Sequence, residues 1–339
     1  MKEKLLGKTL EELRAAAVEC GLKAFVGTQI ADWLYKKKVC SWDDMRNVSA
    51  AAKAALQEKF ELGTSAPVDS ICSSDGTVKY LFGTGVEAVM IPDDDRRTLC
   101  VSSQVGCKMG CRFCMTGRQG WHGNLDVADI LNQFTSIPQA QELTNTVFMG
   151  MGEPLDNYDA VARAIEVLTA DWGWGWSPKR ITLSTIGVLP ALKKYLDGQR
   201  CHLAISIHNP IPEERAGFMP AQKAWDIREV LELIRRYDWT AQRRVSFEYT
   251  MFAGWNDDKV HADALIRLLK GLECRVNLIR FHKIPDFSYE TSSANVMEAF
   301  KDRLCNNGIT CTIRASRGED ILAACGMLAG KAAELGKKG

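Results

Sequence analysis

The chain has 339 residues, of which 46% are hydrophobic and 25% are charged. These proportions are typical of a folded globular protein and exclude a fibrous or largely disordered chain. The 43 basic residues nearly balance the 42 acidic ones and leave a net charge of +1. A binding site for a polyanion such as RNA therefore has to be a local patch.

The first part of the chain is predicted to be helical. Thr9 and Glu12 form a capping box ahead of apolar residues that recur at helical spacing. Two further helices are predicted over residues 31–37 and 51–60. A stretch with the composition of a linker follows, so we expect a small helical domain over residues 1–66.

The rest of the chain is predicted to contain a sheet. Strand-like runs at 78–82 and 86–91 are broken by Gly and Pro and indicate a linker and β extension over 67–97. After it, strand candidates alternate with helix-length segments, which is typical of repeated βα units and a mainly parallel sheet. The six candidates are residues 99–103, 146–149, 180–184, 203–207, 245–251 and 275–281. Functional groups gather at the carboxyl ends of such strands.

The sequence contains 12 cysteines. They are too few for a disulfide framework and more than packing requires. The first ten residues lack the apolar region of a secretory signal, and no apolar run approaches the ~20 residues of a membrane span. We therefore expect a cytoplasmic protein with reduced thiols, in which clustered cysteines are metal ligands or catalytic groups.

Three of these cysteines form a Cys-x3-Cys-x2-Cys pattern directly after the first core strand: Cys107, Cys111 and Cys114. Thiolates are the usual ligands of iron–sulfur clusters, and three of them leave one iron of a four-iron cluster open. A zinc site is the alternative, with His122 as a possible fourth ligand. Three buried apolar cysteines would be the other explanation.

This spacing, with Phe113 before the third cysteine, resembles the signature of the radical S-adenosylmethionine (SAM) superfamily. The resemblance implies that the open iron binds SAM and that an electron cleaves SAM to a 5′-deoxyadenosyl radical. A second match is Met-Gly-Met-Gly-Glu-Pro at 149–154, which resembles the stretch that holds the SAM amino group. A carboxylate such as Glu153 accepts charge-assisted hydrogen bonds from an ammonium group.

Further motifs narrow the resemblance to the RlmN/Cfr family of RNA adenosine methyltransferases. They occur in the family's order at residues 98–107, 183–185, 206–208 and 317–326. The N-terminal segment, with Gln29-Ile30, Trp33-Leu34 and Trp42-Asp43-Asp44-Met45, resembles the accessory domain of the RlmN branch. The resemblance implies an α/β fold: a partial (βα)6 radical SAM barrel over 98–315, a C-terminal segment over 316–339 and an RNA-binding helical accessory domain over 1–66.

The resemblance also implies a mechanism that uses two SAM molecules per turnover. Cys325 takes a methyl group from the first SAM, and the radical made from the second removes a hydrogen from that methyl group. The resulting carbon radical adds to an adenine ring carbon. By the match, Cys100 resolves this adduct and ends as a disulfide with Cys325, and Glu87 is a candidate proton acceptor. Without the motifs, both cysteines would be interpreted as core residues and Glu87 as a solvent-facing carboxylate.

Other matches imply contacts with SAM. The residues are Gly152, Glu153, Ser184, Ser206, Ile207, His208 and His282. His282 stands where the family generally has asparagine, and a neutral imidazole can still donate one hydrogen bond and accept another.

The sequence therefore predicts a cytoplasmic radical SAM enzyme that methylates C2 of adenosine in 23S rRNA and in tRNA. Its expected cofactors are a [4Fe-4S] cluster and SAM, and its expected partners are these RNAs and a flavodoxin-type electron donor, with no membrane. Lys36-Lys37-Lys38 is a candidate RNA contact, and the tryptophans at 172, 174 and 176 are expected to pack their loop. The alternatives are Cfr-like methylation of C8, radical chemistry on a small molecule or peptide, and a zinc-stabilised RNA-binding module.

Overall fold

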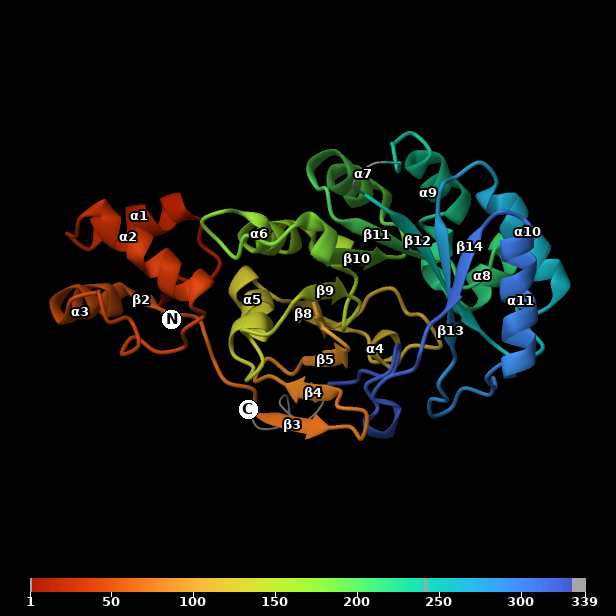
Figure 1. The fold of residues 1–339 in the computed structure, drawn as a ribbon, viewed down its shortest axis with the longest axis horizontal. Coiled ribbons are helices and arrows are strands. Elements are labelled where there is room, and N and C mark those ends of the chain that lie inside the picture. The colour runs from red at the N-terminus through yellow and green to blue at the C-terminus, as the bar shows by residue number, and fades with distance from the viewer. Residues whose placement is uncertain (1, 241–242, 331–339) are drawn as a thin grey trace.

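The computed structural model describes residues 2–240 and 243–330. Its N-terminal helices form a lobe at one end of the molecule (Figure 1). They are α1 (Leu10–Glu19), α2 (Ala24–Ala31), a π-helical turn (Asp32–Lys36) and α3 (Ala50–Lys59). The capping box of Thr9 and Glu12 is confirmed. The second helix begins at Ala24 rather than at residue 31, because the chain turns directly after α1 and packs α2 against it.

A ten-stranded sheet forms the rest of the core, in the order β14-β13-β12-β11-β10-β9-β6-β5-β4-β3. Neighbouring strands from β14 to β6 are parallel, and those from β6 to β3 are antiparallel. The parallel strands are β6 (Arg96–Cys100), β9 (Asn145–Phe148), β10 (Ile181–Thr185), β11 (His202–Ser206), β12 (Val245–Met251), β13 (Arg275–Arg280) and β14 (Thr310–Ile313). Five of the six predicted core strands are confirmed to within one residue at each end. The first, predicted at 99–103, lies at 96–100 instead, and β14 is an additional strand that the sequence analysis missed.

The antiparallel part is the predicted β extension: β3 (Asp69–Cys72), β4 (Val78–Leu81) and β5 (Glu87–Asp93). Two short pairs lie outside this sheet, β1 (Glu3–Lys4) with β2 (Phe60–Glu61) and β7 (Gln104–Gly106) with β8 (Trp121–Asn124). Side chains at the ends of β10 to β13 and in the loops that follow line a common pocket, as expected for a sheet of βα units.

Helices follow most of the parallel strands, and several begin at a side-chain cap, for example Asp226 before α9 and Asp258 before α10. The helices are α4 (Met115–Arg118), α5 (Val127–Thr135), α6 (Tyr158–Thr169), α7 (Leu189–Gly198), α8 (Pro212–Phe218), α9 (Ile227–Ile234), α10 (Lys259–Leu269) and α11 (Ala294–Asn306). Short 3-10 turns occur at Pro154–Asn157, Pro178–Arg180, Pro220–Lys223 and Glu319–Ile321. No helix of the described residues is long and apolar enough to cross a membrane.

Side chains from the lysine run fix the N-terminal lobe to the core. Lys38 donates to the carbonyl of Ala140 at 2.6 Å and lies 3.9 Å from the ring centroid of Trp174. Burial lowers the pKa of Lys38 to about 8. Lys36 donates to the carbonyl of Asp171. Two of the three lysines suggested as RNA contacts therefore hold the two parts of the protein together, and Trp174 packs its loop as expected.

Candidate active site

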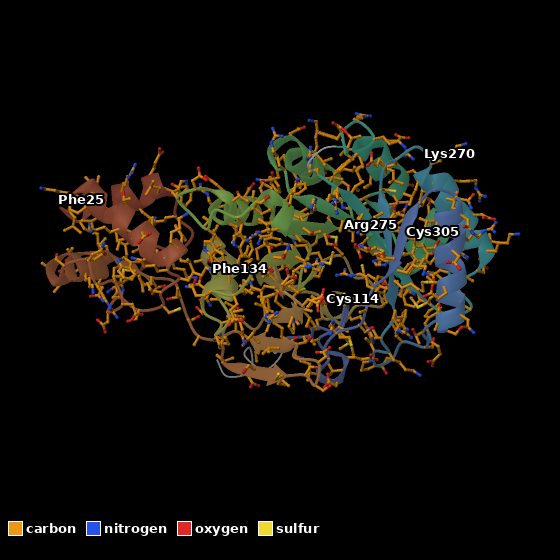
Figure 2. The ribbon with its side chains drawn as sticks, in the orientation of Figure 1. Phe25, Cys114, Phe134, Lys270, Arg275 and Cys305 are labelled. Atoms are coloured by element: carbon orange, nitrogen blue, oxygen red, sulfur yellow. The ribbon has the colours of Figure 1, made fainter. Side chains whose placement is uncertain are left out.

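Two adjoining pockets lie at the carboxyl ends of the parallel strands. The first, here called the cysteine pocket, is lined by Cys107, Cys111 and Cys114 together with residues after β9, β10 and β11. The second, here called the arginine pocket, is lined by Cys100 and Arg314. In Figure 2, Cys114 lies near the middle of the molecule, whereas Cys305 lies on the outer helix α11.

A tight loop presents the three cysteines. Gly106 ends β7 with a φ of +75°, and a Cβ there would lie 1.9 Å from the carbonyl oxygen of Gly120. Only glycine permits this close approach. The N–H of Cys107 donates to the same carbonyl at 2.8 Å, and that of Cys114 donates to the carbonyl of Cys111 at 3.2 Å. The backbone therefore fixes where each thiol enters the pocket.

Burial raises the pKa of Cys107 to about 12. Burial and the neighbouring Cys114 and Cys107 thiols raise the pKa of Cys111 well above its usual value. Three crowded thiols of this kind ionise together only next to a cation. Among the described residues, no three Cys, His, Asp or Glu side chains converge on one metal ion. The pocket presents these three thiols without His122, which fits a four-iron cluster with one open iron better than a zinc site with four protein ligands.

Glu153 is buried in the same pocket. Its carboxylate accepts hydrogen bonds from the N–H groups of Leu155 at 3.1 Å and Ile186 at 3.0 Å. Gln104 holds the backbone of Glu153, because its side-chain oxygen accepts from the Glu153 N–H at 2.9 Å. Burial raises the pKa of Glu153 to about 7, against the lowering effect of these hydrogen bonds. A buried carboxylate of this kind is suited to bind an ammonium group.

The predicted Ser206 and His208 also line the cysteine pocket. Burial lowers the pKa of His208 to about 3, so its ring is neutral. Nδ1 accepts from the N–H of Thr250 at 3.0 Å, which leaves the ring proton on Nε2. Arg215, fully buried, donates to the carbonyls of Ile207 at 3.0 Å and Ser206 at 2.9 Å and to Gln222 at 2.5 Å.

Replacing Arg215 with methionine is expected to lower the free energy of unfolding by about 3 kcal/mol, because three buried acceptors lose their donor. Urea unfolding of the full chain measures this change. Arg228→Met on the exposed side of α9 is the matched control, and equal stability of the two variants would contradict this role for Arg215.

Cys325 is one of the residues shared by the two pockets. Cys107, Cys111 and Cys114 line the cysteine pocket with it, and Cys100, whose pKa burial raises to about 12, lines the arginine pocket with it. Both Cys100 and Cys325 are free thiols. The predicted disulfide between them is therefore absent from this state of the protein.

The place where the two pockets meet at Cys325 is here called the junction. Two charged residues that line the pockets beside it were missed by the sequence analysis. Glu248, on β12, is buried and accepts from Asn277 at 2.8 Å and from Arg314 at 3.4 Å. Arg314 follows β14 and also donates to the sulfur of Met149 at 3.5 Å. A carboxylate within the apolar strand 245–251 was the signal for Glu248, since a charge buried in a parallel strand requires a partner.

The structure brings most predicted site residues together and leaves five outside the cysteine pocket, one of which, Cys100, lines the arginine pocket instead. Ile207 is fully buried beside it. His282 lines the arginine pocket, with Nε2 3.1 Å from the Ser316 hydroxyl and Nδ1 3.3 Å from Glu319. The remaining two, Glu87 and His122, line neither pocket.

Glu87 contacts the C-terminal segment of the described chain. One carboxylate oxygen accepts from the N–H groups of Ala329 and Gly330, both at 3.0 Å, and the other lies 3.2 Å from the Lys79 ammonium. His122 is exposed on β8 and does not join the three cysteines as a fourth ligand.

Two family models match the chain. Residues 101–265 match the radical SAM superfamily, and residues 3–62 match the N-terminal domain of ribosomal RNA large subunit methyltransferases. The probable dual-specificity RNA methyltransferase RlmN of Parabacteroides distasonis is 57% identical over 331 residues, which cover 96% of each chain. This chain belongs to the RlmN family.

Other RlmN-family relatives extend the match. The dual-specificity RNA methyltransferase RlmN of Syntrophus aciditrophicus is 41% identical over 336 residues, again 96% of each chain. The crystal structure of a radical SAM methyltransferase from Sphaerobacter thermophilus superposes with a TM-score of 0.91 at 36% identity, covering 96% of this chain and 99% of the other. The predicted fold class and the prediction of a radical SAM RNA methyltransferase are confirmed, and membership of the RlmN family implies a [4Fe-4S] cluster and SAM.

Proposed function

We propose that this RlmN-family enzyme methylates C2 of adenosine in 23S rRNA, at the peptidyl-transferase centre, and in tRNA next to the anticodon. The observation that carries the proposal is the position of Cys325 between the cysteine pocket and the arginine pocket. A methyl carrier needs access to SAM on one side and to the base on the other. The dual-specificity RNA methyltransferase relatives support RNA as that base's source.

The chemistry of adenine explains why a carrier and a radical are needed. The ring carbon C2 is electron-poor, so it is a weak nucleophile toward the methyl group of SAM. A carbon radical adds to such a position readily. The enzyme therefore has to convert a methyl group into a radical next to the base.

Three sets of residues prepare this step. Cys107, Cys111 and Cys114 hold the cluster, which when bound supplies the electron that cleaves SAM to a 5′-deoxyadenosyl radical. Glu153 binds the SAM ammonium. The remaining SAM contacts are assigned to Gly152, Ser184, Ser206, Ile207, His208 and His282. His282 reaches SAM only across the boundary of the two pockets, because it lines the arginine pocket.

Cys325 carries the methyl group in two stages. Its thiolate attacks the methyl carbon of a first SAM, the new S–CH3 bond forms, and S-adenosylhomocysteine leaves. The 5′-deoxyadenosyl radical from a second SAM then removes one hydrogen from the S-methyl group. The carbon radical adds to C2 and joins Cys325 to the RNA.

Release requires a proton acceptor and a second thiol. We assign these roles to Glu87 and Cys100. Both carboxylate oxygens of Glu87 are engaged by Lys79, Ala329 and Gly330, so proton transfer from the adenine requires one of these partners to leave. One electron of the adduct would return to the oxidised cluster and its ring proton would pass to Glu87, after which the Cys100 thiolate attacks the Cys325 sulfur. The S–S bond forms, the carbon–sulfur bond breaks and the carbon takes a proton to become the methyl group.

A cytoplasmic location follows from this cycle, because thiol exchange there reduces the disulfide again.

We assign the electron supply to a flavodoxin-type protein. Lys108, about half exposed, lies 4.3 Å from the ring of the exposed Trp121 beside the cysteine loop. The Lys108 ammonium is paired with the Asp156 carboxylate at 3.0 Å, so the assignment of this donor rests on the resemblance to the family.

Binding of SAM is expected to weaken below pH 7. The pKa of Glu153 is about 7 in the free protein, and an ammonium beside it lowers that pKa, so SAM binds the ionised form. The dissociation constant is expected to be about tenfold higher at pH 6 than at pH 8. Calorimetric titration of the cluster-containing protein measures it. Glu153→Gln should remove the pH dependence of the SAM dissociation constant. The same pH dependence in that variant as in wild type would show that another group causes it.

The reaction itself is tested by anaerobic turnover with SAM, a reductant and an unmodified 23S rRNA fragment or tRNA. Mass spectrometry of the nucleosides, against authentic 2-methyladenosine and 8-methyladenosine, reports the reaction and its position together. We expect 2-methyladenosine. The 8-methyl product would place the enzyme with the Cfr branch, and 5′-deoxyadenosine without a methylated nucleoside would indicate another substrate.

Replacing Cys100 with alanine is expected to trap RNA covalently on the protein, because the adduct forms and no thiol resolves it. A shifted band that carries both RNA and protein on a denaturing gel reports the adduct. Cys311→Ala, which removes a buried cysteine at the far edge of the sheet, is the control and should release its product. Free methylated RNA from Cys100→Ala would exclude Cys100 from the mechanism.

A further inference from the structure

The segment that carries Cys325 has little regular structure of its own. After β14 the chain leaves the sheet, and a single 3-10 turn at Glu319–Ile321 is its regular element up to residue 330. Its local backbone hydrogen bonds are few, for example from the N–H of Ala323 to the carbonyl of Gly318 at 2.8 Å. Contacts with other parts of the protein therefore have to set the position of Cys325.

The turn between β3 and β4 makes reciprocal contacts with this segment. Asp75, in the turn, accepts from the N–H of Gly318 at 2.9 Å, while its other oxygen accepts from the Thr77 N–H at 2.9 Å. In return Asp320, in the segment, accepts from the Ser73 hydroxyl at 2.5 Å and from the Ser74 N–H at 3.1 Å. Figure 1 shows these strands beside the blue C-terminal segment.

Gly318 allows the turn and the segment to come close. Its φ is +61°, and a Cβ there would lie 2.8 Å from Cγ2 of Thr77 and 2.9 Å from Cβ of Ala323. A larger residue would force the two backbones apart and break the hydrogen bond to Asp75. The contact therefore depends on Gly318 in the segment as well as on Asp75 in the turn.

Both carboxylates are ionised at neutral pH. Although burial raises the pKa of Asp75, hydrogen bonds from Gly318 and Thr77 hold it well below its usual range. Hydrogen bonds from Ser73 and Ser74 lower the pKa of Asp320. Charge-assisted hydrogen bonds of this kind are stronger than neutral ones.

Cys325 lies between this contact and a second one further along the chain. The N–H of Met115 donates to the carbonyl of Gly326 at 2.8 Å, and the Thr116 hydroxyl donates to the carbonyl of Leu328 at 2.6 Å. The second contact comes from α4, directly after the cluster cysteines. Fixing both ends leaves the thiol little freedom to move away from the pockets.

We propose that the turn between β3 and β4 is a positioning element for Cys325, and that Asp75 and Asp320 are its positioning residues. The inference rests on the proposed role of Cys325 as methyl carrier. The turn lies outside both pockets and takes no part in the chemistry. It holds residues 318–322 so that the S-methyl group stays in reach of the radical and of the base.

The test compares Asp75→Ala with wild type in the full chain that carries its cluster. Asp69→Ala is the matched control, because Asp69 is exposed on β3 and its carboxylate accepts only from the neighbouring Ser70 N–H within the described residues. Amide hydrogen exchange of peptides over 318–328 reports the docking. The ratio of 5′-deoxyadenosine to methylated adenosine reports whether radical formation stays coupled to transfer.

We expect exchange of 318–328 to become about tenfold faster in Asp75→Ala, because the Gly318 N–H loses its acceptor. The product ratio should rise several-fold while the rate of SAM cleavage is retained, since the cysteine pocket is intact. Asp75→Asn, which keeps one acceptor oxygen, should fall between the two. General destabilisation would lower SAM cleavage and methyl transfer together and would leave the ratio unchanged.

Equal exchange in Asp75→Ala and Asp69→Ala would overturn the proposal. Faster exchange with an unchanged product ratio would overturn it too, because the segment would then be docked without positioning the cysteine. If Asp75→Ala fails to fold, Asp320→Asn has to show both changes for the proposal to stand. Failure of the proposed function is distinguishable, because wild type would then give no methylated nucleoside while the exchange experiment still reports docking.

Discussion

Replacing Cys325 with alanine is expected to abolish methyl transfer to RNA, a loss of at least about a thousandfold. The methyl group has no other carrier in the junction, because Cys100, the second thiol of the arginine pocket, does not line the cysteine pocket. SAM cleavage should persist, because the cluster cysteines and Glu153 are unchanged. Mass spectrometry after turnover measures methylated adenosine, which reports methyl transfer, and 5′-deoxyadenosine, which reports SAM cleavage.

Cys305→Ala is the matched control for this experiment. Cys305 is an exposed cysteine on α11 and lines neither pocket. Intact-mass analysis adds a direct reading, since wild type should gain one methyl group on incubation with SAM and Cys325→Ala should not. Methylated adenosine from Cys325→Ala at the wild-type rate would remove this residue from the mechanism.

Replacing Cys111 with alanine is expected to remove the four-iron absorbance and, with it, SAM cleavage. Cys111 is buried with Cys107 and Cys114 as neighbours, and the exposed His122 does not line the pocket. The fourth thiol that lines it, Cys325, is the proposed methyl carrier. With two ligands left, the cluster should not assemble stably. Absorbance, iron and sulfide content, and 5′-deoxyadenosine formation should therefore fall together to background.

The control for Cys111 is Cys201→Ala. Cys201 is also buried, but it belongs to the main hydrophobic core at the start of β11. Its loss should cost some packing energy and leave the cluster spectrum unchanged. Full iron and sulfide content in Cys111→Ala would refute the ligand assignment, and zinc without sulfide in wild type would refute the cluster.

The alternation of strands and helices could be predicted because each element carries its own signal. Strands such as 245–251 are rich in β-branched and aromatic residues, and helices such as α1 begin at recognisable caps. β14 (Thr310–Ile313) was missed because its two threonines leave only two apolar residues, whereas the equally short predicted run 146–149 has three. Its position at the sheet edge depends on pairing with β13.

The cysteine pocket could be predicted for a similar reason. Its ligands come from one loop, and Glu153, Ser184 and Ser206 each lie in or directly after a strand. Parallel strands end at one edge of the sheet, so motifs placed there converge whatever the details of packing. Local sequence therefore determined which residues share this pocket.

The tertiary structure alone decided the contacts made by residues that lie far apart in the chain. Arg314 and Glu248 contact each other at the junction. Lys36 and Lys38 join the N-terminal lobe to the core. Glu87 accepts hydrogen bonds from the backbone of Ala329 and Gly330. No periodicity or spacing encodes such pairs, because each depends on how separate elements pack in space.

The sequence by itself determined the βα architecture and the loop that presents Cys107, Cys111 and Cys114, since these are properties of contiguous residues. Only the tertiary structure decided that Cys325 stands between two pockets and that the turn at Asp75 holds its segment there. The physical reason is that a segment with few hydrogen bonds of its own takes its position from the surfaces on which it packs.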